Sequence, residues 1–282
     1  MSETPRDPGA DAPEPSPEPA GGPRRLALVT GASSGIGRAF AERLARDAWD
    51  LVLVARRRDR LEALAEELRR GTDLRAEVLA ADLGTPAGVR AVEERIEKEP
   101  ILDLLVNNAG FGTSGPFAAL DREAEEEEIR LNVLALARLT HAALGAFAAR
   151  GHGSLVNVSS LAGFQPAPYT AVYAATKAFV NSFTQAVAEE VRGSGVRIQL
   201  LCPGFTRTEF QDVAGVRTDE IPGFAWMEPA AVVDASLEGL RRGQLIVIPG
   251  GGNKVLGTVL RALPAAVARR AGGLLLRRSL DS

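Results

Sequence analysis

The chain has 282 residues, of which 45% are hydrophobic and 24% charged, and its formal net charge is −3. This length and composition fit a globular α/β domain, and the near-neutral charge gives no reason to expect nucleic acid as a partner. The single cysteine, Cys202, excludes a disulfide framework and a cysteine-rich zinc site, and with only two histidines no metal site is expected.

Residues 1–23 contain five acidic residues, one arginine and seven of the 17 prolines, and almost no large apolar side chain. Such a segment cannot bury enough apolar surface to offset the entropy lost on ordering, so we expect a disordered tail. It lacks the basic start and apolar centre of a signal peptide. The chain also has no uninterrupted apolar run of about 18 residues. We therefore expect a cytoplasmic protein without a membrane-spanning helix.

From residue 24 onward, short apolar runs alternate with longer segments of helical periodicity. Strands are expected at 25–30, 51–55, 76–81, 102–106, 154–158, 197–201 and 245–248. Helices are expected at 35–46, 60–70, 86–98, 122–150 and 172–192. Apolar strands separated by helices predict a parallel sheet that is covered on both faces. The right-handed crossover rule then favours a doubly wound, seven-stranded Rossmann fold in a single domain at 24–250.

A glycine-rich turn lies between the first expected strand and the first expected helix. Residues 30–37 read Thr-Gly-Ala-Ser-Ser-Gly-Ile-Gly. Glycines let the backbone approach a diphosphate, and a helix N-terminus supplies N–H donors and partial positive charge. The spacing is looser than G-x-G-x-x-G, and a plain strand-to-helix connection also uses glycine. The setting nevertheless predicts a dinucleotide site. It is formed by Gly31, Ser33, Ser34, Gly35, Ile36 and Gly37.

Three arginines, Arg56, Arg57 and Arg58, follow the second strand, where the adenosine ribose of a dinucleotide would lie. An NAD site has an acidic residue there, whereas guanidinium groups attract the 2′-phosphate of NADP. We therefore expect NADP(H) in preference to NAD(H), with Arg56 as the main contact. A solvated basic helix start is the alternative, and Asp59 could pair with these arginines.

The helix expected at 122–150 begins with an acidic block, Glu123 and residues 125–128. Acidic side chains near a helix N-terminus suit the helix dipole. We expect this block to be a solvated first turn. Asn132 follows within the same helix, and a buried polar side chain there needs a partner. A water relay to Lys177 or an ordinary buried hydrogen bond would supply one.

Tyr173 and Lys177 are four residues apart at the start of the last long helix, so they share a helix face. A cation beside a phenol lowers its pKa from near 10, and such a phenol can protonate a carbonyl oxygen as hydride reaches the carbon. Ser160 follows the fifth strand, at the carboxyl edge where open α/β sheets bind ligands. Its hydroxyl could hold the substrate oxygen beside the phenol.

These motifs together resemble the short-chain dehydrogenase/reductase family in order and spacing, over about residues 24–250. The resemblance implies an oxidoreductase in which Tyr173 is the general acid/base and Ser160 anchors the substrate oxygen. Lys177 would bind the nicotinamide ribose and lower the pKa of Tyr173, with Asn132 in a proton relay. The resemblance extends to further residues that would contact the cofactor: Asp82, Leu83, Asn108, Ala109, Gly110, Pro203, Gly204, Thr206 and Thr208.

The resemblance also bears on the choice of cofactor and on assembly. Arg56 matches the position that the family uses to select NADP, whereas the basic residue that some NADP-using members carry in the glycine turn is Ser33 or Ser34 here. The two long helices resemble the surface through which family members form dimers. A homodimer or homotetramer is therefore expected.

Five aromatic residues are expected near the catalytic edge: Phe111, Phe164, Phe205, Phe224 and Trp226. Apolar walls with few polar anchors suit a lipophilic ketone or keto-acyl substrate, although ordinary core packing would use the same residues. The basic, apolar stretch 251–282 is expected to pack on the protein itself or on a second subunit. The alternative is contact with an anionic membrane surface.

Three classes of function remain in competition. A carbonyl reductase or alcohol dehydrogenase is favoured. A non-catalytic dinucleotide-binding sensor on the same scaffold is the first alternative, and the complete set of Asn132, Ser160, Tyr173 and Lys177 argues against it. A membrane-associated structural protein is the second alternative, and it leaves the glycine turn unexplained.

Overall fold

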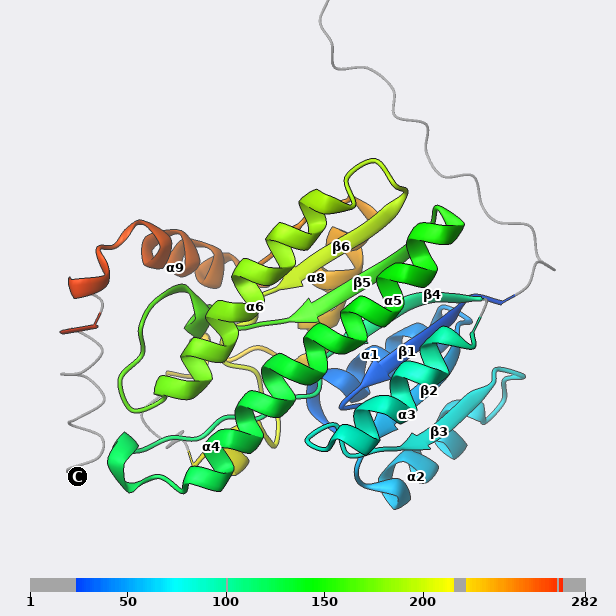
Figure 1. Ribbon diagram of the computed structural model, residues 1–282, viewed down its shortest axis with the longest axis horizontal. Coiled ribbons are helices and arrows are strands. Elements are labelled where there is room, and N and C mark those ends of the chain that lie inside the picture. Colours follow the sequence, from blue (N-terminus) through cyan, green and yellow to red (C-terminus); the bar gives the residue numbers. More distant parts are fainter. Residues whose placement is uncertain (1–23, 100, 216–221, 268, 271–282) are drawn as a thin grey trace, which may run out of the picture.

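The computed structural model describes residues 24–99, 101–215, 222–267 and 269–270. The tail expected at 1–23 and the last part of the 251–282 extension lie outside the described residues. Seven parallel strands form one sheet in the order β3-β2-β1-β4-β5-β6-β7, with helices on both faces (Figure 1). The predicted doubly wound α/β fold in a single domain is therefore confirmed.

The strands are Leu26–Thr30 (β1), Asp50–Ala55 (β2), Ala76–Ala80 (β3), Leu102–Asn107 (β4), Gly153–Val158 (β5), Val196–Leu201 (β6) and Ile246–Val247 (β7). β1 pairs with β2 on one side and with β4 on the other. The direction in which strands are added thus reverses between β1 and β4. Ligands of open α/β sheets bind at the carboxyl ends of the strands at such a point.

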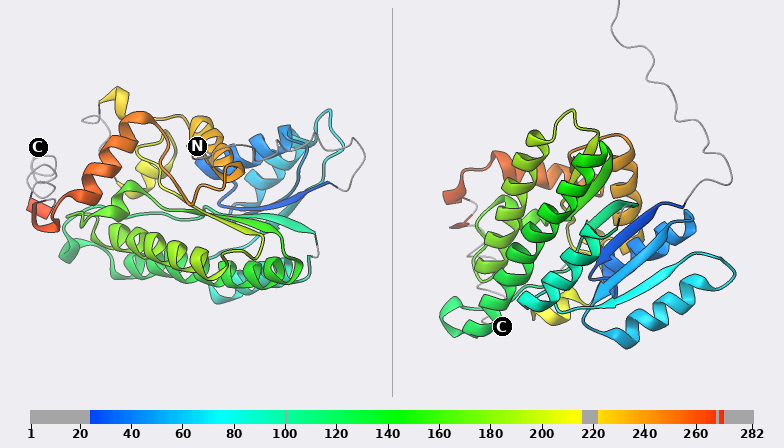
Figure 2. Two further views of the ribbon diagram at one scale, coloured as in Figure 1. Left: turned by 90° about the horizontal axis from the view of Figure 1, so that it is seen from above. Right: turned by 45° about the vertical axis from the view of Figure 1, so that its right-hand side comes forward.

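Six long helices cover the sheet in two layers, which Figure 2 shows edge-on. On one face lie Gly35–Arg46 (α1), Arg58–Arg69 (α2) and Pro229–Arg241 (α8). On the other lie Pro86–Glu97 (α3), Leu136–Arg150 (α5) and Ala171–Glu190 (α6). Alternate residues of β1 face opposite layers: Ala27 and Val29 belong to the first core, Leu26 and Leu28 to the second. This two-sided burial explains why the strand is apolar throughout.

The segment expected as one helix at 122–150 consists of three consecutive parts. They are Arg122–Ile129 (α4), a π-helical segment at Arg130–Ala135, and α5. Among the described residues this 29-residue helix is the one long and apolar enough to cross a membrane. Its α5 part packs against α3, β4 and β5, which is the position of a core helix in an α/β protein.

Two further helices complete the carboxyl edge, Phe210–Ala214 (α7) and Gly251–Ala262 (α9). In α9, Gly257 packs so closely that an added Cβ would lie 2.7 Å from Ile248 and 3.3 Å from Leu161. The side-chain amide of Gln165 donates to the carbonyls of Leu260 and Leu263. The described part of the C-terminal extension therefore packs on the protein itself.

Candidate active site

The glycine turn between β1 and α1 is tightly packed and leaves backbone donors free. Gly31 and Gly35 have φ values of +67° and +55°, and an added Cβ at Gly37 would lie 2.3 Å from the Gly31 carbonyl oxygen. The first turn of α1 contains no acidic residue, and Ser34 makes no side-chain capping bond. The N–H groups at the start of α1 are thus available to an anionic ligand, so these residues fit a dinucleotide diphosphate.

The end of β4 holds this turn in place. The Thr30 hydroxyl accepts from the backbone N–H of Asn108 at 2.9 Å and of Ala109 at 3.0 Å. It donates to the Val106 carbonyl at 3.2 Å. The side-chain amide of Asn108 donates to the Thr30 carbonyl at 2.9 Å. The predicted residues after β1 and β4 therefore form one connected unit.

The structure brings Arg57, rather than Arg56, to the glycine turn. Arg57 Nη2 donates to the hydroxyls of Ser33 and Ser34, both at 3.0 Å. The Arg56 side chain is 61% exposed and pairs with Glu127 at 3.0 Å. Arg58 pairs with Glu62, so the partners found for these arginines do not include Asp59.

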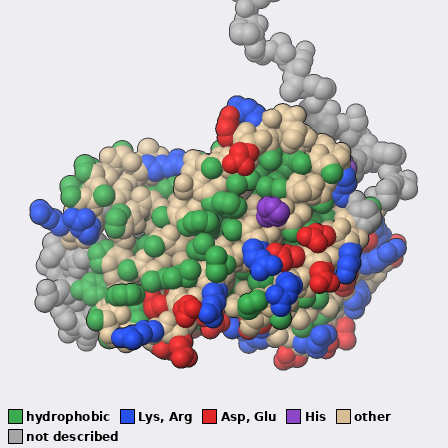
Figure 3. All heavy atoms as spheres, viewed as in Figure 1, with side chains coloured by type: hydrophobic (Ala, Val, Ile, Leu, Met, Phe, Trp, Pro, Cys, Tyr) green, Lys and Arg blue, Asp and Glu red, His purple; other side chains and the backbone are tan. Residues whose placement is uncertain are grey.

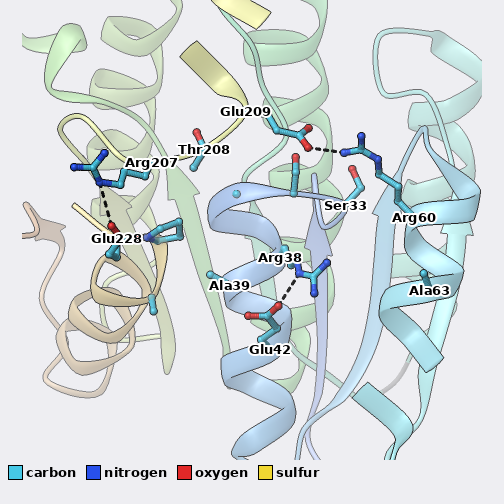
Figure 4. Close-up of a pocket in the computed structure, with 14 residues that line it drawn as sticks. Ser33, Arg38, Ala39, Glu42, Arg60, Ala63, Arg207, Thr208, Glu209 and Glu228 are labelled. Atoms are coloured by element: carbon cyan, nitrogen blue, oxygen red, sulfur yellow. Dashed lines mark hydrogen bonds and ion pairs between the residues drawn. The ribbon is translucent and has the colours of Figure 1, made fainter. Parts of the chain in front are cut away.

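A cavity of about 640 Å³ lies beside the turn, on the α1 side (Figure 4). Glu209 bridges Arg57 at 2.9 Å and Arg60 at 2.6 Å, and these bonds lower the pKa of its carboxyl. Arg207 pairs with Glu228 on the opposite wall. The basic side chains of this cavity are thus matched by acidic ones, and its lining does not include the residues predicted to be catalytic.

Tyr173, Lys177 and Ser160 converge at the carboxyl edge of the sheet. Lys177 is 5% exposed, and its Nζ donates to the Val158 carbonyl at the end of β5, at 2.9 Å. The same Nζ lies 5.7 Å from the centre of the Tyr173 ring. The Ser160 hydroxyl lies close enough to the Tyr173 phenol to act on its pKa, which it lowers. The three predicted groups therefore stand together, as a catalytic set requires.

Burial dominates the pKa values of this set. It raises the pKa of Tyr173 to about 12, while the Ser160 hydroxyl acts in the opposite direction. Burial lowers the pKa of Lys177 to about 8, and the charge of Glu128 opposes that change. The causes that shift the Tyr173 pKa do not include Lys177, and the largest of them is desolvation of the phenolate, which raises that pKa.

Asn132 lies in the π-helical segment and holds the loop that follows β4. Its Nδ2 donates to the Phe111 carbonyl at 2.8 Å and to the Thr176 hydroxyl at 3.2 Å, and its Oδ1 accepts from the Phe111 N–H at 3.2 Å. An added Cβ at Gly110 would lie 2.8 Å from this Oδ1 and 3.6 Å from Lys177 Nζ. Asn132 and Lys177 therefore flank Gly110.

The acidic block of α4 is not a solvated first turn, because two of its residues are buried. Glu125 is 7% exposed and Glu128 is 0% exposed, and both contact the Thr113 hydroxyl. Burial raises the pKa of Glu128 to about 7. Their burial is not evident from the sequence, because it comes from the packing of α4 against α6. Their spacing with Asn132, three and then four residues, is the signal that could have revealed a shared helix face.

The remaining residues predicted to contact the cofactor follow other strands at the same edge. After β3, the Asp82 carboxylate accepts from the Gly84 N–H at 2.9 Å, and Leu83 is 5% exposed. After β6, the Thr206 hydroxyl donates to the Gly204 carbonyl at 3.1 Å. Thr208 packs against Gly35, where an added Cβ would lie 2.9 Å from its methyl group.

The aromatic residue that touches Tyr173 is Phe210 of α7, with ring centres 5.2 Å apart. Of the predicted apolar wall, Phe205 packs on Trp226 at 5.6 Å. Phe164 lies beneath the Arg261 guanidinium, 4.7 Å from it. Phe224 is 92% exposed, so it forms no wall in this conformation.

Comparisons with known proteins agree with this geometry. Residues 25–217 match the family model described as short chain dehydrogenase. "Sulfoacetaldehyde reductase 2" of Chromohalobacter salexigens is 39% identical over 188 residues, which are 66% of this chain and 74% of that protein.

Solved structures are similar over most of the chain. A short-chain dehydrogenase from Sphingobium yanoikuyae in complex with NADPH has a TM-score of 0.79 at 41% identity, covering 84% of this chain and 92% of that one. The bulky-bulky ketone specific alcohol dehydrogenase from Comamonas testosteroni has a TM-score of 0.75 at 36% identity, covering 84% and 91%. The likeness therefore extends over most of the chain.

Proposed function

Because the chain belongs to the short-chain dehydrogenase family, we propose that it transfers hydride between NADP(H) and a carbonyl carbon or secondary alcohol, with Tyr173 as general acid/base. Membership of the family makes it an oxidoreductase that acts on carbonyl or alcohol groups. The observation that carries the finer proposal is the convergence of Tyr173 with Ser160 and Lys177 at the sheet edge.

The chain's own residues supply the proton and hold the reacting groups. NADPH, when bound, supplies the hydride. The hydroxyls of Ser160 and Tyr173, which lie close to each other, hold the carbonyl oxygen between them. Tyr173 gives its proton to that oxygen as negative charge develops there. The nearby Lys177 ammonium stabilises the phenolate that remains.

Arg57 supports the choice of NADP(H) over NAD(H). Its guanidinium bonds to both serines of the turn, and a 2′-phosphate beside them would receive charge-assisted hydrogen bonds. Arg56, one residue earlier, remains exposed and could add a second cation. The NADPH-bound relative at 41% identity favours the same choice.

An apolar ketone or keto-acyl compound is the proposed substrate class. Phe210 packs on the Tyr173 ring, and Phe205 with Trp226 forms a second aromatic pair in the same segment. Apolar surface beside a few polar anchors suits a lipophilic carbonyl compound. The similarity to an alcohol dehydrogenase specific for bulky ketones supports this class over the small charged aldehyde named for another relative.

The decisive experiment measures NADPH oxidation with bulky aryl and alkyl ketones and with sulfoacetaldehyde. We expect turnover of bulky ketones, and a loss of about 10²-fold or more in Tyr173→Phe. NADPH binding should persist in the variant, as measured by cofactor fluorescence. If wild type and Tyr173→Phe both bind NADPH but neither reduces any compound of the panel, the non-catalytic sensor would be favoured instead.

A homo-oligomer in the cytoplasm completes the proposal. Apolar side chains gather over the face on which α5 and α6 lie (Figure 3). Large apolar side chains exposed on the neighbouring α4, the π-helical segment and α6 are Ile129, Leu134 and Phe179, which are 43%, 54% and 39% exposed. An exposed apolar patch of this kind suits a subunit contact. Light scattering on the purified protein tests it, and a monomeric mass at micromolar concentration would contradict it.

A further inference from the structure

Two carboxyl groups and one hydroxyl form a buried cluster beside the catalytic set. The Thr113 hydroxyl contacts Glu125 Oε1 and, at 3.0 Å, Glu128 Oε2. The Thr113 backbone N–H donates to the same Glu128 oxygen at 3.1 Å. The second oxygen of each carboxyl is buried and has no hydrogen-bond partner among the described residues.

The number of hydrogens in this cluster limits its charge. A hydroxyl has one hydrogen, so Thr113 can donate to only one of the two carboxylates. The other contact becomes a hydrogen bond only if that carboxyl carries a proton and donates it to the Thr113 oxygen. Two ionised carboxylates would also repel each other in this buried site, and carboxylates that share a site normally retain one proton. One proton between Glu125 and Glu128 would satisfy both contacts to the Thr113 hydroxyl.

The cluster lies next to the groups that carry out the proposed chemistry. The ionisable groups that act on Glu128 are Glu125 of its own helix and Lys177 of α6, and Glu128 in turn acts on Tyr173. Lys177 is a buried cation, and a nearby anion favours its charged form. Glu125 and Glu128 with one proton between them therefore carry one negative charge beside the Ser160, Tyr173 and Lys177 set, and Glu128 itself is the anion above its pKa of about 7.

Glu128 also shares a mechanical role with Asn132. The two residues are one helical turn apart, and both hold the loop that follows β4. Asn132 bonds to the backbone of Phe111, and Glu128 bonds to the backbone and side chain of Thr113. This loop passes Gly112, where an added Cβ would lie 2.8 Å from the Tyr173 ring. The carboxyl thus fixes a segment in contact with the catalytic phenol.

We propose that Glu125 and Glu128 share one proton at neutral pH, and that Glu128 is a positioning residue that holds the 110–113 loop and keeps Lys177 protonated. The shared proton is a property of the protein alone, whereas the effect on catalysis rests on the proposed function. Loss of the shared proton at higher pH leaves two negative charges at the cluster. Protonation of both carboxyls at low pH removes the anion that faces Lys177.

Infrared titration of the full-length protein counts the shared proton directly. A protonated carboxyl has a C=O stretching band that ionised carboxylates lack. Wild type is expected to show such a band at pH 6, and to lose it as the pH rises through about 7, the pKa of Glu128. Glu128→Gln should remove the band, because the amide can donate to Thr113 and replaces the carboxyl whose pKa burial raises.

Glu126→Gln is the matched control, since Glu126 stands on the same helix, is exposed and pairs with Arg130. The band should persist in this variant. A wild-type protein without the band at pH 6 would overturn the shared proton, and so would a band that persists in Glu128→Gln. The wild-type titration decides this point even if one variant fails to fold.

The pH profile of NADPH-dependent ketone reduction tests the effect on Lys177. Reduction needs protonated Tyr173 and Lys177, and removal of the Glu128 charge lets both lose their protons at lower pH. Glu128→Gln should therefore move the alkaline limb of the profile down by about one pH unit, and Glu126→Gln should leave it in place. An unmoved limb in Glu128→Gln overturns the role at Lys177. If wild type reduces no ketone, the proposed function fails while the infrared result still decides the shared proton.

Discussion

Arg57 contacts the glycine turn because it lies where the chain turns from β2 into α2. It is the residue before α2 and has φ −83° and ψ 88°, so its side chain leaves the backbone just as the chain turns from β2 into the helix. Arg56 precedes it on the outward side of this turn and is held by Glu127. The sequence showed that three cations gather here, but which of them faces Ser33 depends on the backbone dihedrals of one residue.

Replacing Arg57 should therefore weaken NADPH more than any change at its neighbours. Charge-assisted hydrogen bonds contribute about 1.5–3 kcal/mol, so Arg57→Gln is expected to raise the KM for NADPH by about 10- to 100-fold. The KM for NADH should stay unchanged, because NADH has no 2′-phosphate. Steady-state kinetics with both cofactors measures this.

Arg58→Gln is the control for Arg57→Gln, since Arg58 is exposed and pairs only loosely with Glu62, at 3.6 Å. It should leave both KM values unchanged. A larger rise in the NADPH KM for Arg56→Gln than for Arg57→Gln would restore Arg56 as the main contact. A wild-type enzyme that uses NADH as well as NADPH would contradict the proposed cofactor.

Glu128 should make the protein less stable as the pH rises. Its folded-state pKa is about 7, against an ordinary 4.5, so between these values the folded protein binds more protons than the unfolded chain. The free energy of unfolding therefore falls as the pH rises through this window, by up to about 3 kcal/mol from this group. Urea unfolding at pH 5 and pH 8 should show a smaller fall in Glu128→Gln than in wild type or Glu126→Gln. Equal falls in all three would contradict the raised pKa.

The proposed catalytic residues and the buried acids differ in how far sequence can predict them. Tyr173 and Lys177 are four residues apart on one helix, and Ser160 stands two residues after the end of β5, so local structure alone brings them to the sheet edge. The burial of Glu125 and Glu128 depends instead on α4 packing against α6 and on the loop that carries Thr113. Those are contacts between distant segments, which a pattern within one helix does not reveal.

At the scale of elements, the π-helical segment Arg130–Ala135 places Asn132. A π-helical turn accommodates one additional residue within a longer helix, and such turns occur frequently at functional sites. The helices on either side of the segment keep their apolar faces on the core. Within the segment, the side chains point in other directions than they would in a regular α-helix. The sequence predicted one continuous helix at 122–150 because the apolar periodicity on either side is nearly unbroken.

Deletion of Leu134 tests the role of this segment. Leu134 is 54% exposed, and without it the segment can become regular α-helix while α4 and α5 keep their faces. Asn132 would then turn away from the Phe111 backbone, and we expect kcat/KM to fall by about 10²-fold. Circular dichroism and NADPH binding should remain close to wild type. Leu134→Ala, which removes the side chain but not the residue, should retain activity, and a fully active deletion would contradict this role.

The positions of the strands were predicted more closely than the contacts of the individual site residues. β1 and β4 are buried on both sides, so their apolar runs mark them clearly, and the expected bounds differ from the observed ones by a residue at an end. β7 is only Ile246–Val247, shorter than the expected 245–248, because only these two residues pair with β6. Edge strands lack the second neighbour that would extend the pairing.

For the molecule as a whole, α9 joins the C-terminal extension to the catalytic edge. Gly257 lies against Leu161 and Phe164, the two ends of the short helical turn that follows Ser160 in the chain. Asn253 fills the space beside Gly204, where an added Cβ would lie 2.6 Å from its side-chain oxygen. The outward side of α9 remains apolar, with Val255 67% exposed. The described contacts of α9 thus lie on the side of the site proposed to bind substrate, and they do not involve the glycine turn.

A chain that ends at Gly250 should therefore fold and bind NADPH with near-normal affinity, yet reduce ketones poorly. Loss of the α9 contacts uncovers Leu161 and Phe164, so we expect the free energy of unfolding to fall by about 1–3 kcal/mol and the KM for bulky ketones to rise. Vesicle co-sedimentation separates packing from membrane contact. Packing predicts equal partitioning of the shortened and full-length chains, and Val255→Ser in the full chain should not alter it. Selective binding of the full-length protein to anionic vesicles, lost in Val255→Ser, would instead show that the exposed side of α9 meets a membrane.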